Sequence, residues 1–402
     1  MGSAWQSVSG LPGWVRALLI GQFVNAAGAL AWVYLALYLV ESRHLGASEA
    51  GLLTGINGVG VIAGNFIAGW IGDRIGSRRT LLWGLVGWAV CCALVPVSPV
   101  AVLAPLLLIA GTLGGFGRPL MMAVVLGALP AEQRRVAASM WRAVFNAGAI
   151  VGPPLGALAA SWNFGIVFVI DGVSSLVLAA AVARWVPRPS SSPQPHVTEK
   201  PASVWRTLVA RPFPLAILLT VVVVDSSYRQ LYVGLPFELH HLNAPTLIYG
   251  LTITANCVLI VLGEVWVAVR MAHHSPRSLI GLGYALTGAS WLIFAVMTNV
   301  AGAFVLVAVI SVGEMLYKPT ATAAVADAAP SGYEARYQSL YAGASVAGVV
   351  IAPPIGGALI SHPTVLWLLC GLLPIACAGV IVRRPDGHAA QHLDQPIARS
   401  TA

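Results

Sequence analysis

The sequence predicts an all-α integral membrane protein with twelve transmembrane helices arranged as two parallel six-helix repeats. Three observations lead to this fold class: the apolar composition, the spacing of the apolar runs and a self-similarity between the two halves. Of the 402 residues, 58% are hydrophobic and 9% are charged. This leaves too little polar surface to cover a water-soluble protein of this length, and it excludes an intrinsically disordered chain.

About 20 apolar residues are needed to cross the ~30 Å hydrocarbon core of a bilayer. Twelve runs approach or exceed this length: Val15–Val40, Gly51–Ile71, Thr80–Val97, Val102–Val124, Ala137–Ala160, Gly165–Ala183, Pro214–Leu239, Tyr249–Val269, Leu279–Val296, Ala301–Ala323, Tyr337–Ile360 and Val365–Val382. The amphiphilic leader Met1–Gly13 lacks the basic region and cleavage site of a secretory signal, so we expect it to belong to the mature protein.

Basic residues in the loops predict the orientation. Lys and Arg follow or flank the even-numbered spans on one side of the membrane, whereas the opposite side carries only Arg43. The positive-inside rule therefore predicts a multi-pass protein of the cell membrane with both termini in the cytoplasm. The Ser- and Pro-rich segment 187–205 is expected to be a cytoplasmic linker between bundles 1–186 and 206–402, the second of which ends in a short cytoplasmic tail.

The two halves of the chain repeat each other. A shift of 200 residues aligns Phe116–Ala157 with the second half without a gap and gives 11 identities in 42 positions. The matches include Pro153-Pro154 with Pro353-Pro354, and a shift of 199 pairs Gly51 with Gly250. Two parallel repeats predict a substrate path at the interface between them.

The loop between the second and third spans combines glycines, an acid and arginines. Its motif residues are Gly69, Asp73, Arg74, Gly76, Arg78 and Arg79. The motif closely resembles the G-x-x-x-D-R-x-G-R-R loop of the major facilitator superfamily. We expect it to act as a conformational latch, with Arg142 as a partner of Asp73 or of lipid phosphate. The alternative is that its arginines only set the topology.

The fifth span carries a second motif, formed by Gly148, Gly152, Pro153, Pro154 and Gly156. It resembles the G-x-x-x-G-P-x-x-G motif associated with antiporter branches of the same superfamily. Adjacent prolines interrupt the hydrogen-bond ladder, and the glycines permit close packing against the partner repeat. We expect a bent helix at the domain interface. The alternative is a bend without a role in coupling.

The similarity extends to the seventh and tenth spans, through Tyr228-Arg229-Gln230, Leu235-Pro236 and Gly313–Pro319. It identifies the chain as similar to the twelve-helix drug:proton antiporters and implies the major facilitator fold, in which spans one, four, seven and ten line a central cavity. One position departs from the pattern. The fourth-span arginine of that group is replaced by Gly111, and Arg118 is the only cation in that span.

Charged residues within the spans indicate the transport site, because each costs roughly 2.5–3.5 kcal/mol at the bilayer centre unless it is partnered or hydrated. Asp225 and Arg229 lie four residues apart on one helix face, as do Glu314 and Lys318, so each pair could neutralise itself. The resemblance implies a substrate cavity lined by Asn25, Tyr34, Arg118, Tyr228, Arg229, Gln230, Tyr317 and Lys318.

Glu314 is the expected proton carrier because it matches the tenth-span glutamate of the similar antiporters, and Asp225 is the second choice. Burial raises the pKa of a carboxyl group and a nearby cation lowers it. A carboxylate that is buried in one conformation and next to a cation in the other therefore binds a proton in the first and releases it in the second. The alternative is a static ion pair. Glu264 and Asp171 are weaker candidates, because the family fold places their spans beside the cavity.

These features predict a proton-coupled secondary active exporter of amphiphilic small molecules, in multidrug or metabolite efflux. The expected partners are a small-molecule substrate, protons and the lipid bilayer, without nucleic acid, and we expect a monomer. No enzyme motif, cofactor site or metal-ligand spacing is present in the sequence. The alternatives are a proton-coupled uptake symporter, a flippase for a lipid-linked metabolite, and a receptor or scaffold that no longer cycles.

The topology can be tested with single cysteines at Ser191 and Ser48 in a version that lacks the five native cysteines. A membrane-impermeant thiol reagent should label the two positions from opposite sides of the membrane, because an odd number of spans separates them. Labelling of both from the same side would contradict the twelve-span arrangement.

Overall fold

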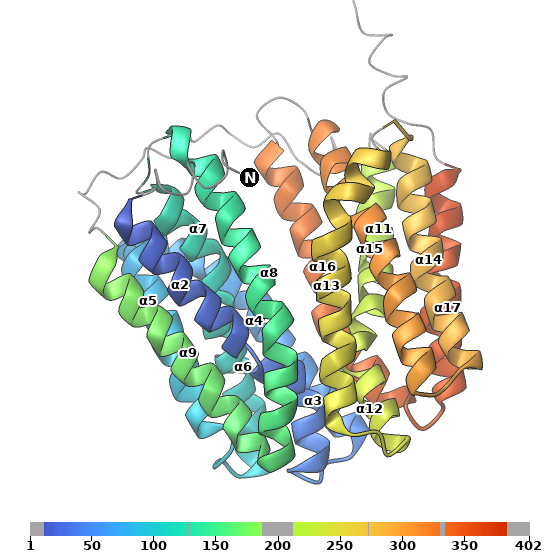
Figure 1. Cartoon of the computed structure of the whole chain (residues 1–402), viewed down its shortest axis with the longest axis horizontal. Helices are drawn as coiled ribbons and strands as arrows, with labels where there is room; N and C mark the ends of the chain where they lie inside the picture. The colour runs from blue at the N-terminus through green and yellow to red at the C-terminus, as the bar shows by residue number, and fades with distance from the viewer. Residues whose placement is uncertain are drawn as a thin grey trace, which may run out of the picture.

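The computed structural model describes residues 12–127, 129, 131–186, 212–271, 273–329 and 334–383. Within these residues all regular structure is helical. Figure 1 shows two bundles side by side, the first half of the chain on the left and the second half on the right. The predicted fold class is confirmed. The expected linker 187–205 and most of the leader and tail lie outside the described residues.

The first bundle contains eight α-helices and one short 3₁₀ helix among the described residues. In chain order they are α2 (Gly13–Gly28), α3 (Ala31–Glu41), α4 (Ala47–Ile75), α5 (Ser77–Leu94), η1 (Val100–Val102), α6 (Leu103–Gly115), α7 (Gly117–Gly127), α8 (Ala131–Trp162) and α9 (Phe164–Trp185).

The second bundle follows the same plan. Its described elements are α11 (Pro212–Arg229), η2 (Gln230–Tyr232), α12 (Gly234–His241), α13 (Thr246–Met271), α14 (Pro276–Val296), α15 (Val300–Asp327), α16 (Glu334–Leu359) and α17 (Pro363–Val382).

Eleven helical segments of the described chain are long and apolar enough to cross a bilayer. The eighteen-residue α5 (Ser77–Leu94) is not one of these eleven, and it corresponds to the third predicted span, Thr80–Val97. Three spans that the sequence predicts as continuous helices are interrupted. The first divides into α2 and α3, the fourth into α6 and α7, and the seventh into α11 and α12, which η2 joins. Apolar periodicity does not report such breaks, because both halves of each span remain apolar.

Polar caps and proline fix where several helices begin. The side chains of Asn163, Ser275 and Asn299 each accept a hydrogen bond from a backbone N–H in the first turn of α9, α14 and α15, respectively. Pro276 occupies the first turn of α14, where its missing N–H removes no intrahelical bond. Each of these three helices follows the preceding one after a short connection, so the two spans that each connection joins run antiparallel.

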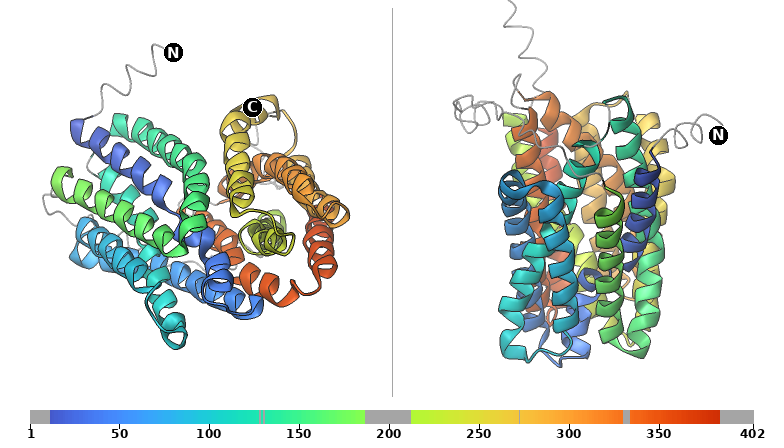
Figure 2. Two further views of the ribbon diagram at one scale, coloured as in Figure 1. Left: turned by 60° about the horizontal axis from the view of Figure 1, so that its bottom comes forward. Right: turned by 90° about the vertical axis from the view of Figure 1, so that its left-hand side faces the viewer.

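The bundles have two distinct ends. We call the end where α2 begins and α17 finishes the terminal end, and the opposite end, where α3 and α12 finish, the far end. In Figure 1 the bundles approach one another near α3 and α12 and lie further apart toward the terminal end. Figure 2 shows the same separation of the two helix groups from below.

The contact between the bundles is built twice, once by each repeat. On one side α4 packs against α16, and on the other α13 packs against α8. A Cβ atom added to Gly51 would lie 2.3 Å from the Pro353 carbonyl oxygen, and one added to Gly250 would lie 2.7 Å from the Pro153 carbonyl oxygen. Only glycine allows helix backbones to approach so closely. The paired glycines and prolines of the repeat are therefore interface residues.

This close contact is confined to the far half of the helices. Along α4, an added Cβ would meet α16 at Gly51, Gly55 and Gly58. Closer to the terminal end, Gly69 of α4 and Gly343 of α16 have no atoms within 4 Å of an added Cβ. The far end is therefore closed by packing between the bundles, and α4 and α16 diverge toward the terminal end.

Two glycines of α16 give a matched test of this asymmetry. A Cβ at Gly357 would lie 2.2 Å from the Ala47 carbonyl oxygen, whereas one at Gly343 would meet open space. We expect Gly357→Ala to weaken far-end closure by about 1–3 kcal/mol through overpacking. Gly343→Ala should have little effect. Distances between spin labels on α3 and α12 measure closure, and equal effects of the two substitutions would contradict this arrangement.

Candidate transport site

The centre of α15 carries the predicted ion pair. The Lys318 ammonium lies 2.5 Å from Oε1 of Glu314, one turn away on the same helix. It also lies 4.0 Å from the ring centroid of Tyr228 on α11, which is a cation–π distance. The side chain of Lys318 is 29% exposed and that of Glu314 is 13% exposed. Carboxylate and aromatic ring thus hold one ammonium group between α11 and α15.

Asp225 is bound differently from the prediction. Its carboxylate accepts hydrogen bonds from the hydroxyls of Tyr317 on α15 and Ser345 on α16. The pairing with Arg229 that the spacing suggested is not among its contacts within the described residues. The guanidinium of Arg229 instead lies 5.9 Å from the ring centroid of Tyr232. Two neutral hydroxyls therefore take the place of the expected cation.

A polar network behind Tyr228 was not predicted. The Tyr228 hydroxyl donates to Oδ1 of Asn256 on α13 at 3.2 Å, and Nδ2 of Asn256 donates to Ser311 of α15 at 2.8 Å. The shift of 199 residues that aligns Gly51 with Gly250 also pairs Asn256 with Asn57, and this was the only sequence signal for Asn256. The network fixes the ring against which the Lys318 ammonium lies, so it orients the site.

The remaining predicted cavity residues are bound elsewhere. Asn25 donates to Ser175 of α9 at 3.0 Å, and Gln230 donates to the Ala352 carbonyl of α16 at 2.8 Å, each within its own bundle. Tyr34 donates to the Pro153 carbonyl oxygen at 2.5 Å. The structure therefore gathers Tyr228, Glu314, Tyr317 and Lys318, and places these three apart from them. The side chain of Arg118 lies outside the described residues.

The glycines of the fifth-span motif face a different helix from the one expected. An added Cβ at Gly148, Gly152 or Gly156 would meet Ala26, Ala27, Leu30 or Tyr34 of the first span. The prediction that these glycines pack against the partner repeat is therefore wrong. The contact of this helix with the second bundle includes a backbone carbonyl within the motif, because the hydroxyl of Thr254 on α13 donates to the Ile150 carbonyl at 3.1 Å.

The loop motif is partly described. Gly76 has a φ of 96°, a conformation that favours glycine, and it joins α4 to α5. Arg78 donates to the Ala183 carbonyl at 2.7 Å near the end of α9, and the Arg74 guanidinium lies 3.7 Å from the Trp70 ring centroid. Arg79 is exposed. The side chains of Asp73 and its expected partner Arg142 lie outside the described residues.

The two weaker acidic candidates differ in burial. Glu264 of α13 is half-buried. Asp171 of α9 is only 3% exposed, and its carboxylate accepts from the backbone N–H of Ala31 and from the indole of Trp88, both at 2.8 Å. Asp171 is therefore fully engaged inside the first bundle.

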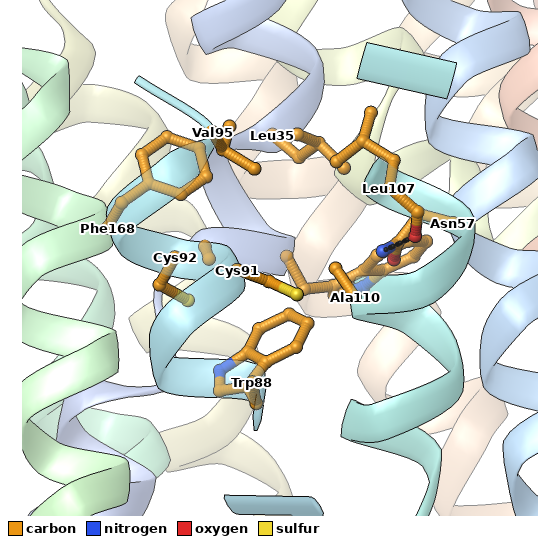
Figure 3. Close-up of a pocket in the computed structure, with 11 residues that line it drawn as sticks. Leu35, Asn57, Trp88, Cys91, Cys92, Val95, Leu107, Ala110 and Phe168 are labelled. Carbon is orange, nitrogen blue, oxygen red and sulfur yellow. Dashed lines mark hydrogen bonds between the residues drawn. The ribbon is translucent and has the colours of Figure 1, made fainter. Parts of the chain in front are cut away.

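A pocket lies beside this contact (Figure 3). Its lining residues include Ala31, Trp88, Cys92 and Phe168. Asn57 also lines it, with its amide donating to the Leu107 carbonyl at 2.9 Å. The lining is almost entirely apolar, so the pocket offers no anchor for a charged ligand. Within the described residues no group of three His, Cys, Asp or Glu side chains could hold a metal ion.

The far end carries contacts between the bundles that the sequence did not suggest. Nδ1 of His240 on α12 lies 3.0 Å from Oε1 of Glu41 on α3. The Tyr249 hydroxyl of α13 donates to the Val33 carbonyl at 3.0 Å, and its ring packs edge-on against Tyr34 at 5.5 Å between centroids. All of these contacts to the second bundle come from α3.

Comparison with known proteins agrees with this architecture. The family model of the Major Facilitator Superfamily matches residues 18–333 and 217–398. The chain belongs to the major facilitator superfamily. This membership also confirms a multi-pass membrane protein of the transporter class.

Two bacterial relatives illustrate the range of similarity. The MFS-type transporter YttB of Bacillus subtilis is 27% identical over 90% of this chain and 92% of its own length. The multidrug efflux pump LfrA of Mycolicibacterium smegmatis is 37% identical over 34% of this chain and 27% of its own length. Among solved structures, the POT family transporter PepTSo superimposes with a TM-score of 0.76 at 15% identity, covering 96% of this chain and 99% of that one. This last likeness concerns the fold alone.

The Glu314–Lys318 pair can be tested by a double-mutant cycle. Lys318→Met should destabilise the protein by about 1–3 kcal/mol, because it leaves the Glu314 carboxylate without its cation in a largely buried place. Adding Glu314→Gln should recover most of that loss, because the unpaired charge disappears. Thermal unfolding of the purified variants measures both effects, and additive losses would show that the two side chains do not interact.

Proposed function

We propose that this transporter is a proton-coupled secondary active exporter of amphiphilic small molecules that works by alternating access. The observation that carries the proposal is the Lys318 ammonium, held between the Glu314 carboxylate and the Tyr228 ring midway along α15. Ionisable groups inside a membrane span are expensive and mark ion pathways. Transporters of this class bind substrate and coupling ions near the bilayer midplane.

The pair gives a simple proton switch. An ionised Glu314 holds Lys318, and Oε2 of Glu314 is buried without a hydrogen-bond partner among the described residues. Protonation of the carboxylate would neutralise its attraction for the ammonium and free Lys318 and the Tyr228 ring together. A cationic substrate that enters between the carboxylate and the ring has the opposite effect, because its positive charge favours the ionised acid. Proton and substrate would therefore compete for one site.

Asp225 is the second proposed proton carrier. Its two hydroxyl donors lie on α15 and α16, so its carboxylate joins three helices of the second bundle. Ionised aspartate accepts both hydrogen bonds, whereas the protonated acid has to donate one of its own. A proton on Asp225 would therefore alter the contact between α11 and α16, the helix that packs against α4 of the first bundle.

The loop motif fits a latch that is released in this conformation. With the predicted topology the terminal end is cytoplasmic, so closure at the far end corresponds to an inward-facing state. Gly69 at the start of the motif has no neighbour within 4 Å of an added Cβ. We propose that Asp73 and its neighbours engage the second bundle when the terminal end closes.

Relatives support the direction of transport. The printed names include a multidrug efflux pump, LfrA, and a Na(+), Li(+), K(+)/H(+) antiporter of Planococcus maritimus that is 27% identical over 41% of this chain. Both names describe outward pumping or exchange against protons. An uptake symporter would move protons and substrate in the same direction, and the following experiment separates the two.

The role of Glu314 can be measured in proteoliposomes with a lipophilic cationic dye and a pH-sensitive reporter. Wild type should release protons into the compartment from which the dye is removed. Glu314→Gln should abolish dye-driven proton movement while it retains dye binding, because the amide keeps the shape of the side chain and carries no titrating proton. Glu49→Gln, an exposed acid at the start of α4, is the matched control.

Three results would change the assignment. Proton movement in the same direction as the dye would establish a symporter. Normal coupling in Glu314→Gln would transfer the role to Asp225, for which Asp225→Asn is the corresponding variant. Absence of any proton movement in wild type with a transported dye would contradict proton coupling altogether.

A further inference from the structure

The first span is broken where its two halves meet. Helix α2 ends at Gly28, and Ala29 adopts φ −74° and ψ 68°, the conformation of an inverse γ-turn. The Leu30 N–H donates to the Gly28 carbonyl at 2.8 Å, which closes this turn. Helix α3 then begins at Ala31, so its first N–H groups have no carbonyl of a preceding helical turn to bind.

Asp171 supplies the missing acceptor. Oδ2 of its carboxylate accepts from the Ala31 N–H and Oδ1 accepts from Nε1 of Trp88, both at 2.8 Å. One buried side chain of α9 therefore ties the start of α3 to α5. Gly28 makes room for this contact, because a Cβ there would lie 2.3 Å from the Ser174 hydroxyl one turn along α9.

Within the described residues, the second bundle has no equivalent of this anchor at the corresponding positions. A shift of 200 residues places Gly288 at the position of Trp88 and Gly371 at the position of Asp171. There the two backbones approach directly, since a Cβ at Gly288 would lie 2.3 Å from the Gly371 carbonyl oxygen. The break in the seventh span is instead bridged by η2, and Gln230 binds the Ala352 carbonyl of α16. The fold that the two repeats share therefore does not require an acidic residue at position 171.

Helix α3 contacts the second bundle at the far end, beside the contacts that α4 and α8 make there. It provides the Val33 carbonyl and the Tyr34 ring to Tyr249, and Glu41 to His240. When the far end opens, these contacts have to separate. Because the turn at Ala29 separates α3 from α2, the movement of α3 with its own bundle depends on its contacts with the other helices of that bundle. These include the Tyr38 hydroxyl, which donates to the Val95 carbonyl at 3.3 Å, and the Asp171 carboxylate.

We propose that Asp171 is a positioning residue of the transport cycle, whose carboxylate anchors α3 to α5 and α9 so that this helix moves with the first bundle when the far end opens. The inference rests on the proposed alternating-access function. It concerns the far-end gate and is independent of which acid carries the proton. Substitution by Asn turns one acceptor oxygen into a donor that faces another N–H donor, so it breaks one of the two hydrogen bonds and keeps the volume.

Two spin-label pairs in a version without the native cysteines test this proposal. Labels at Ser42 and Leu242, which follow α3 and α12, report opening of the far end, and labels at Ser42 and Ile166 report whether α3 stays with α9. These positions are exposed, Leu242 by 38% and Ile166 by 36%. Distances are measured at acidic and alkaline pH and with the cationic dye, in wild type and in Asp171→Asn.

In wild type we expect the Ser42–Leu242 distance to change between conditions while the Ser42–Ile166 distance stays constant. In Asp171→Asn the Ser42–Ile166 distance should acquire a second, longer population when the far end opens. Dye turnover should fall by about ten- to a hundredfold with KM unchanged, since the variant lacks a hydrogen bond to a charged acceptor that holds α3 during far-end opening, while the Glu314–Lys318 site is left intact. A merely structural role would lower stability without separating α3 from α9.

Trp88→Phe offers a milder variant that keeps the acid and removes only the indole donor. The fraction of molecules with the longer Ser42–Ile166 distance should be smaller in this variant than in Asp171→Asn. Trp83→Phe on the same helix is its control, because Trp83 is 61% exposed. A constant Ser42–Ile166 distance in Asp171→Asn, with normal far-end opening, would overturn the inference and leave the proposed function intact. A Ser42–Leu242 distance in wild type that never changes would refute alternating access, and the inference with it.

Discussion

Inside a bilayer, a backbone N–H or C=O without a partner costs several kcal/mol, because no water is present to bind it. This chain nevertheless breaks its helices at several places, and side chains from other helices bind the groups that are freed. Asp171 accepts from the Ala31 N–H at the break in the first span. Pro154 cannot donate to the Ile150 carbonyl, and the hydroxyl of Thr254 does so from the other bundle. These two irregularities are thus also ties between helices.

The same requirement explains why the interface between the bundles lies where it does. Prolines 153 and 353 stand at corresponding places of the repeat, and their carbonyls face Gly250 and Gly51, respectively. At these places helix backbones meet without intervening side chains, so contact is close and directional. The two repeats differ in their polar contacts at this interface. On one side the Thr254 hydroxyl donates a hydrogen bond to the other bundle, whereas Gly55, which stands at the corresponding place on the other side, has no side chain that could donate one. The two halves of the interface are therefore chemically unequal, although their backbones follow one plan.

Much of the fold could be predicted from the sequence, since twelve apolar runs and a 200-residue repeat indicate the number of spans and their division into two similar bundles. The Glu314–Lys318 pair was predictable too, because one turn of helix brings residues four apart together. Asp225 shows the limit of that rule: Tyr317 and Ser345, distant in the chain, are its partners in place of Arg229. The breaks in the spans and the partners of Asp171 also depend on contacts between distant residues. A single sequence does not show which polar groups meet across the bundle.

The break in the first span has a consequence for biosynthesis. The Ala31 N–H and the carboxylate that binds it are separated by 140 residues, so the first span leaves the ribosome well before α9 has been made. During that interval an open N–H in the lipid would be costly. The nascent first span is therefore expected to enter the membrane as one continuous helix, with Ala31 bonded to its own preceding turn. The turn at Ala29 would then form as a late step of assembly, once the sixth span has entered the membrane and Asp171 can bind the Ala31 N–H.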